Sequence, residues 1–130
     1  MVSGCSTINV NLRNVVSNLF AFLNGNYQIA TIVNGKPSWK NDAHAIWYIQ
    51  SYSAWSIGPL SQIGNNAGSI FTFNISGITD DDNQWWYWYG NGLTSPSDPN
   101  DIQITCIAFT CKLDTIQDFF SNFRIKWQLN

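Results

Sequence analysis

The chain has 130 residues, a length that suits one domain. It is 45% hydrophobic and only 11% charged, with 16 Asn and no Glu, so the composition excludes an intrinsically disordered chain. The net charge is -2 and the largest basic grouping is Arg124-Ile125-Lys126, which argues against a nucleic-acid partner because phosphate binding needs clustered Lys and Arg.

The N-terminal part of the chain predicts a strand, a short helix and a hairpin. Apolar and polar residues alternate over 8–13, as in a half-buried strand. The apolar residues of 15–23 follow helical spacing and predict a short helix, although they also fit an irregular strand. A strand over 27–33 then meets Asn34-Gly35, a strong hairpin signal because both positions tolerate positive φ, and the return strand begins at Trp39.

The rest of the chain predicts short strands separated by turn and loop signals. The predicted strands cover 45–51, 54–57, 70–75, 84–89, 102–109 and 123–129. The predicted loops cover 61–69, 77–83 and 90–101, and a helical turn is predicted at 115–120. About eight short strands with frequent turns predict an all-β fold, an antiparallel sandwich or flattened barrel with one or two short helical turns. We expect residues 1–130 to form a single β-rich domain.

Residues 25–58 carry large aromatic residues around two turn signals. The pattern consists of Gly25 and Tyr27, the turn Asn34-Gly35-Lys36-Pro37, Trp39, the pair Trp47-Tyr48, and Trp55 with Ile57. This segment resembles a small aromatic β-repeat found in many large, poorly characterised proteins of unicellular eukaryotes and marine organisms. The resemblance implies an extracellular or surface scaffolding role and supplies no catalytic residues. It does not extend to residues 70–130.

The one cluster of carboxylates in the sequence is Asp80-Asp81-Asp82, followed by Asn83. Oxygen-bearing side chains in a loop are the ligands that Ca²⁺ prefers, so Asp80 and Asp82 are candidate calcium ligands, although the spacing is not that of an EF-hand. A solvated turn is the alternative interpretation. No other cofactor is expected.

Five consecutive aromatic residues occupy 85–89. Since alternate residues of a strand face opposite sides, Trp85, Tyr87 and Tyr89 share one face, and Trp86 and Trp88 share the other. Both faces cannot be exposed without a large apolar patch, so one face is core and the other is covered by the chain, a ligand or another subunit. The candidate contact residues are Trp86, Trp88, Tyr52, Asp80, Asp81, Asp82 and Asn83.

The three cysteines, Cys5, Cys106 and Cys111, leave an odd thiol if two of them pair. Cys106 and Cys111 are close enough in sequence to bridge a tight hairpin, and Cys5 reaches one of them if the terminal strands are neighbours. Three buried free thiols are the remaining alternative. Asn74-Ile75-Ser76 is a candidate glycosylation site, relevant only in a secreted protein.

No motif in the sequence indicates catalysis, and His44 is interpreted as a lone loop histidine. We therefore expect no enzymatic activity. Low charge permits self-association because repulsion between copies is weak. We expect a structural module, a fibre or surface-layer subunit whose partners are copies of itself; the alternative is a carbohydrate-binding module that uses exposed Trp and Tyr with Asn and Asp. We expect an extracellular or cell-surface location, although no signal-peptide pattern is present, and the longest apolar stretch is too short to span a membrane.

Overall fold

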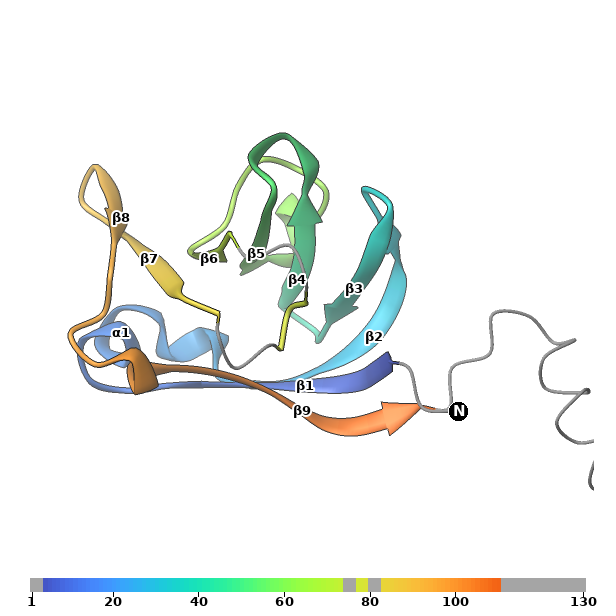
Figure 1. Cartoon of the computed structure of the whole chain (residues 1–130), viewed down its shortest axis with the longest axis horizontal. Coiled ribbons are helices and arrows are strands. Elements are labelled where there is room, and N and C mark those ends of the chain that lie inside the picture. Colours follow the sequence, from blue (N-terminus) through green and yellow to red (C-terminus); the bar gives the residue numbers. More distant parts are fainter. Residues whose placement is uncertain (1–3, 74–76, 80–82, 111–130) are drawn as a thin grey trace, which may run out of the picture.

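The computed structural model describes residues 4–73, 77–79 and 83–110, and its nine strands form one antiparallel sheet that curls into a half-barrel (Figure 1). The strands are β1 (Gly4–Leu12), β2 (Gly25–Val33), β3 (Lys36–Lys40), β4 (His44–Ile49), β5 (Ala54–Pro59), β6 (Ile70–Thr72), β7 (Trp85–Tyr89), β8 (Gly92–Thr94) and β9 (Ile102–Thr110). The helical elements are α1 (Asn14–Phe20) and the 3-10 turns η1 (Ala21–Leu23), η2 (Gln50–Tyr52), η3 (Leu60–Gln62) and η4 (Pro99–Asp101). The predicted all-β antiparallel architecture is confirmed.

The order of the sheet is β8-β7-β6-β5-β4-β3-β2-β1-β9. Strands β1 to β8 therefore follow chain order, as short hairpin connections favour. The exception is β9, which returns to pair with β1 from Gly4↔Thr110 to Leu12↔Ile102. Figure 1 shows β9 beside β1 at the bottom of the half-barrel. This return places the last described strand at one edge of the sheet and β8 at the other.

The main core lies inside the curl of the sheet. Every second residue of β1 and alternate residues of the other long strands point there, as the period of two requires. The buried set is Ile8, Val10, Leu12, Val16, Leu23, Tyr27, Trp39, Ile46, Tyr48, Trp55, Ile57, Ile70, Ile78, Trp85, Tyr87 and Ile102. α1 and η1 cover part of this face, and the Phe20 ring packs edge-on against Tyr87 with centroids 6.5 Å apart.

The central strand β4 is buried on both faces, which explains its continuous apolar run from Ala45 to Ile49. Its second face packs into a smaller core with Phe71 beneath the loop that follows β5. The loop lies close because Gly68, at φ +144°, has no side chain; a Cβ there would collide with the Ser56 hydroxyl. Trp47 Nε1 donates to the Asn65 carbonyl at 3.0 Å and fastens the loop.

The helix and the hairpin predicted in the first half of the chain are confirmed, whereas the return strand begins at Lys36 and not at Trp39, and the loop predicted over 90–101 is wrong. The helix predicted over 15–23 appears as α1 followed by η1. The Asn34-Gly35 hairpin has the expected positive φ at both residues, 52° and 85°. The segment 90–101, predicted as a loop, contains β8 and η4. Gly90, at φ 62°, allows a tight turn that returns the chain against β7. The predicted elements at 115–120 and 123–129 lie outside the described residues.

Candidate functional site

The β7–β8 hairpin carries the largest group of aromatic side chains, divided between its two faces. Trp85 and Tyr87 are buried in the main core. Tyr89 follows on the same face, where it is 59% exposed and meets the Tyr87 ring edge-on at 6.4 Å. The face of β7 that points into the half-barrel is therefore core at its start and open to solvent at its end.

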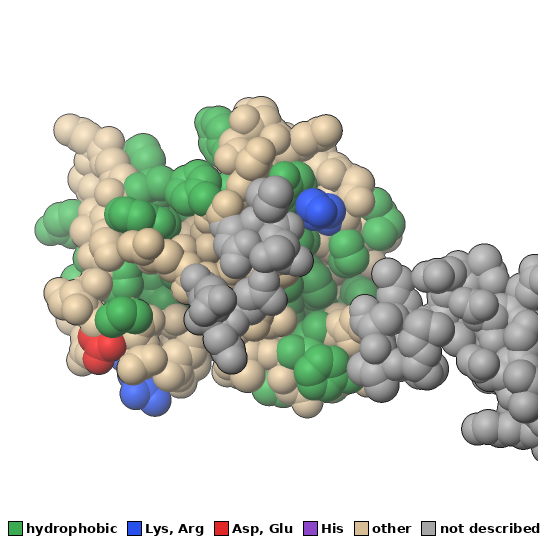
Figure 2. Space-filling model, in the orientation of Figure 1, with side chains coloured by type: hydrophobic (Ala, Val, Ile, Leu, Met, Phe, Trp, Pro, Cys, Tyr) green, Lys and Arg blue, Asp and Glu red, His purple; other side chains and the backbone are tan. Residues whose placement is uncertain are grey.

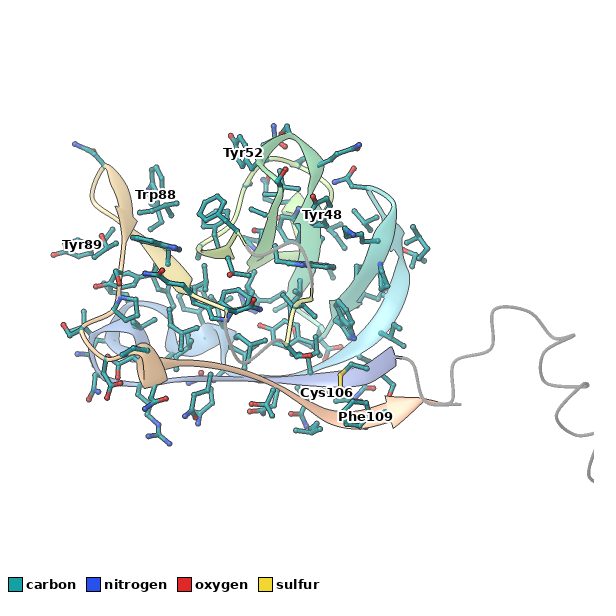
Figure 3. All side chains as sticks on the ribbon, viewed as in Figure 1. Tyr48, Tyr52, Trp88, Tyr89, Cys106 and Phe109 are labelled. Atoms are coloured by element: carbon teal, nitrogen blue, oxygen red, sulfur yellow. A yellow bond between two sulfur atoms is a disulfide. The ribbon has the colours of Figure 1, made fainter. Side chains whose placement is uncertain are left out.

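The other face of β7 presents the two candidate contact residues Trp86 and Trp88. Trp86 is partly buried and pairs with Phe71 across the β6–β7 ladder. Trp88 is 49% exposed and pairs with Leu93 on β8. Tyr52, also half exposed, lies in η2 on a different hairpin, as Figure 3 shows. The structure thus presents Trp88 and Tyr52 to solvent from separate hairpins and covers part of Trp86.

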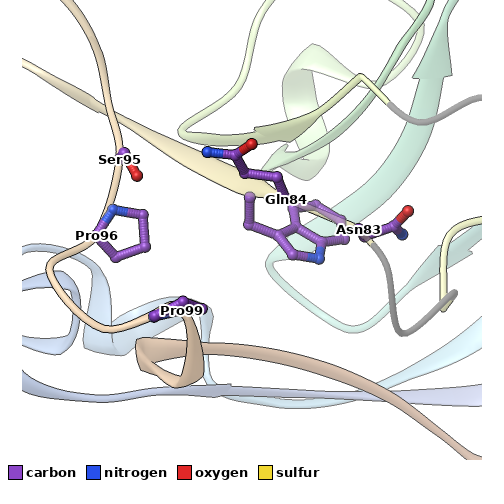
Figure 4. A pocket seen from close by; sticks show the side chains of 6 residues that line it. Asn83, Gln84, Ser95, Pro96 and Pro99 are labelled. Atoms are coloured by element: carbon purple, nitrogen blue, oxygen red, sulfur yellow. The ribbon is translucent and has the colours of Figure 1, made fainter.

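A pocket of about 270 Å³ lies between the start of β7 and the connection from β8 to β9. Its lining is uncharged and consists of Asn83, Gln84, Trp85, Ser95, Pro96 and Pro99. Figure 4 shows Pro96 and Pro99 on the connection and Asn83 and Gln84 at the start of β7. Amides, a hydroxyl and apolar rings together suit a small neutral ligand with hydroxyl groups.

Asn83 is the member of the predicted acidic cluster that the structure describes; Asp80, Asp81 and Asp82 lie outside the described residues, as do Asn74 and Cys111. The Asn83 Nδ2 group donates to the carbonyls of Gly77 and Ile78 at 2.8 and 2.9 Å. Its Oδ1 atom is buried and has no hydrogen-bond partner in the described part of the chain. Within residues 4–73, 77–79 and 83–110, no three His, Cys, Asp or Glu side chains are grouped to hold a metal ion.

Two carboxylates on the β8–β9 connection have local structural partners. Asp98 accepts a hydrogen bond from the Asn100 backbone N–H at 2.9 Å and caps η4. Asp101 is buried and accepts from Asn14 Nδ2 at 2.7 Å. These contacts tie the start of β9 to the start of α1, so both side chains serve the fold of this connection.

A disulfide joins Cys5 to Cys106 across β1 and β9, with Cα atoms 5.7 Å apart. This is one of the pairings that the sequence left open, and it exists because β9 returns to lie beside β1. Trp39 Nε1 donates to the Cys5 carbonyl at 2.9 Å, which links the bridged strands to β3. The disulfide fastens β9, the strand at the edge of the sheet, to its single described neighbour.

His44 is the first residue of β4, and not the loop residue that the sequence predicted. Its ring lies 5.4 Å from that of Phe22, and partial burial lowers its pKa below 6.5. The backbone N–H of His44 donates to Asn41 Oδ1 at 2.8 Å, so the residue completes a turn. Nearby, burial raises the pKa of Tyr27 well above its ordinary value, and its hydroxyl donates to the Leu23 carbonyl at 2.6 Å.

The outer edge of β9 has no partner strand within the described residues. β9 is nine residues long and has no charged residue and no proline. It exposes Ile107 (51%) and Phe109 (65%), and Figure 3 shows Phe109 at the far end of the strand. Charged side chains are also sparse on the face of the molecule seen in Figure 2. Sequence reasoning missed this edge, although the uncharged run from 102 to 110 was the available signal.

No protein family, curated protein or solved structure matched this chain. The resemblance of residues 25–58 to a surface β-repeat therefore stays a prediction. Among the described residues, no helix has the length and apolar character needed to cross a membrane.

Proposed function

We propose that this protein is a non-catalytic structural module that self-associates through the outer edge of β9, as a subunit of a fibre or a surface layer. The observation that carries the proposal is the outer edge of β9, which has no partner strand within the described residues. Natural edge strands are short, or carry charges or proline, because an open row of N–H and C=O groups pairs with any available strand. β8 follows this rule with three residues, whereas β9 has nine residues with no charge and no proline, and its ladder with β1 is irregular only between Cys5 and Ile8.

The energetics of such an interface favour a contribution from backbone pairing. Burying the exposed parts of Ile107 and Phe109 removes about 200 Å² of apolar surface, worth about 5 kcal/mol. Association costs about 4–15 kcal/mol in lost translational and rotational freedom and side-chain ordering. The two side chains alone therefore offset only the lower end of this cost, and hydrogen bonds along the strand edge would supply the rest.

Three further features support a surface role. The low charge of the chain keeps repulsion between copies small. The Cys5–Cys106 disulfide suits an oxidising compartment, because intracellular thiols are kept reduced. The segment 25–58 resembles a repeat of surface and extracellular proteins. We therefore place the module outside the cell or at its surface.

The test is the mass of the particles that the full chain forms, measured as a function of protein concentration. The highest concentration should reach about 1 mM, because a segment tethered within one chain has an effective concentration of the order of mM and competes with association between chains. We expect large, regular particles for the natural sequence. An edge variant, Thr105→Lys with Ile107→Lys, should raise the midpoint concentration of association at least about tenfold, because charged side chains block edge pairing. The control variant, Val15→Lys with Ile32→Lys, adds the same charge at exposed positions away from this edge. A natural sequence that stays monomeric throughout contradicts the proposal.

Carbohydrate binding is the second candidate, and Trp88 and Tyr89 favour it because an exposed aromatic face stacks on a sugar ring. The uncharged pocket at the start of β7 offers the Gln84 amide and the Ser95 hydroxyl to the hydroxyl groups of a sugar. A glycan array, run with and without Ca²⁺, tests this function and the predicted calcium site together. Binding that is lost in Trp88→Ala supports a lectin-like module, and an empty array removes it.

A further inference from the structure

The open edge of β9 and the segment that follows it in the chain are complementary. Among the described residues, β1 to β7 each have two neighbouring strands, while β8 and β9 have one. β9 has nine residues, long enough to pair along the whole of a strand of ordinary length, whereas β8 has only three residues. The half-barrel therefore has one edge that can accept another strand of ordinary length.

The sequence pattern that begins twelve residues after the end of β9 predicts a strand of that length. Residues 111–130 lie outside the described residues, and within them 123–129 alternate apolar and polar side chains. The apolar positions are Phe123, Ile125, Trp127 and Leu129, and the polar positions are Arg124, Lys126 and Gln128. A period of two with one apolar face is the pattern of a strand that adds to a half-buried sheet.

We propose that residues 123–129 are the strand that docks on the β9 edge, donated by one copy of the chain to the next. This inference rests on the proposed self-association and names the segment that carries it out. Pairing is electrostatically unopposed, because β9 is uncharged and Arg124 and Lys126 lie on the polar face of the donor. The apolar face of the donor is available to cover the exposed apolar side chain of β9 that lies on the same face; the register shifts near Ile107 interrupt the alternation between Ile107 and Phe109.

Symmetry favours this donor over the β9 strand of a second copy. Two β9 edges that pair with each other form an isologous contact, which closes at a dimer. A donor strand placed on the β9 edge of the next copy is a heterologous contact. A row of copies joined in this way has a free donor strand at one end and a free β9 edge at the other. Only the second arrangement lengthens without limit, as a fibre or layer requires.

The same strand can also fold back onto its own β9, and concentration decides between the two arrangements. The connection 111–122 has twelve residues, enough to reverse direction. For a connection of about this length the effective concentration is of the order of mM. Pairing within one chain therefore dominates in dilute solution, and donation between chains takes over as the protein approaches about 1 mM.

A complementation experiment tests the proposal with full-length chains. The donor variant, Ile125→Lys with Trp127→Lys, leaves all nine described strands intact and keeps a working edge. The edge variant, Thr105→Lys with Ile107→Lys, keeps a working donor. At about 1 mM, where association between chains competes with the linker, each variant alone should stay monomeric. An equimolar mixture should form a complex of one chain of each kind and nothing larger.

The outcomes separate this inference from the proposed function. If the donor variant assembles like the natural sequence, residues 123–129 are not the donor, and self-association stands. If the natural sequence never assembles, the proposed function fails. If hydrogen exchange then shows β9 protected by its own 123–129 segment, donation between copies is overturned. The control variant, Val15→Lys with Ile32→Lys, should assemble normally, which excludes an effect of added charge alone.

Discussion

The disulfide between Cys5 and Cys106 should supply a large part of the stability of this chain, and Cys5→Ala with Cys106→Ala is the perturbation that measures it. The bridge closes a loop of 101 residues. For a loop of that length, the chain-entropy relation gives about 4.7 kcal/mol at 25 °C. That is a large fraction of the free energy of unfolding of a whole domain, which is typically about 5–15 kcal/mol.

The assay is urea unfolding followed by tryptophan fluorescence, at low micromolar protein so that association does not contribute. With an m-value of about 2 kcal/mol/M, the midpoint should fall by roughly 2 M in the double variant. Reductant should lower the midpoint of the natural sequence by a similar amount and leave the double variant unchanged. Cys111→Ala should have no effect without reductant. A loss smaller than about 1 kcal/mol would refute the loop-entropy argument.

Three further predictions concern the core and its titratable groups, and urea unfolding measures each. Gly68→Ala should destabilise the fold by at least about 2 kcal/mol, because the new Cβ meets Ser56 at an unfavourable φ; a native-like midpoint would show that the loop can move away. Tyr27→Phe should cost about 1–2 kcal/mol by leaving the Leu23 carbonyl unpaired. Because burial raises the pKa of Tyr27, its contribution to the free energy of unfolding is fully present below pH 10 and is lost as the pH rises through the folded-state pKa. The Tyr27→Phe variant should not show this alkaline loss of stability. His44 has a lowered pKa in the folded state, so its contribution to the free energy of unfolding is present above pH 6.5 and is lost as the pH drops through the folded-state pKa. The His44→Gln variant should show a weaker dependence of stability on acid pH.

Prediction succeeded where the information is local. Asn34-Gly35 specifies its own turn through backbone conformation, and the helical spacing of 15–23 specifies α1 without reference to distant residues. The same is true of the two faces of β7, since alternation is a property of any strand. The sequence predicts a loop at 90–101 because β8 is only three residues long and exists through its pairing with β7.

The sequence by itself determined the fold class and most strands, because their period and turns are written within a few neighbouring residues. Only the tertiary structure decided that β9 pairs with β1, since no local pattern encodes contacts between residues about a hundred positions apart. That single pairing selects Cys5 and Cys106 as the disulfide from the open alternatives. It also leaves β9 at the edge of the sheet, so the proposed interaction surface is a consequence of topology and not of a motif.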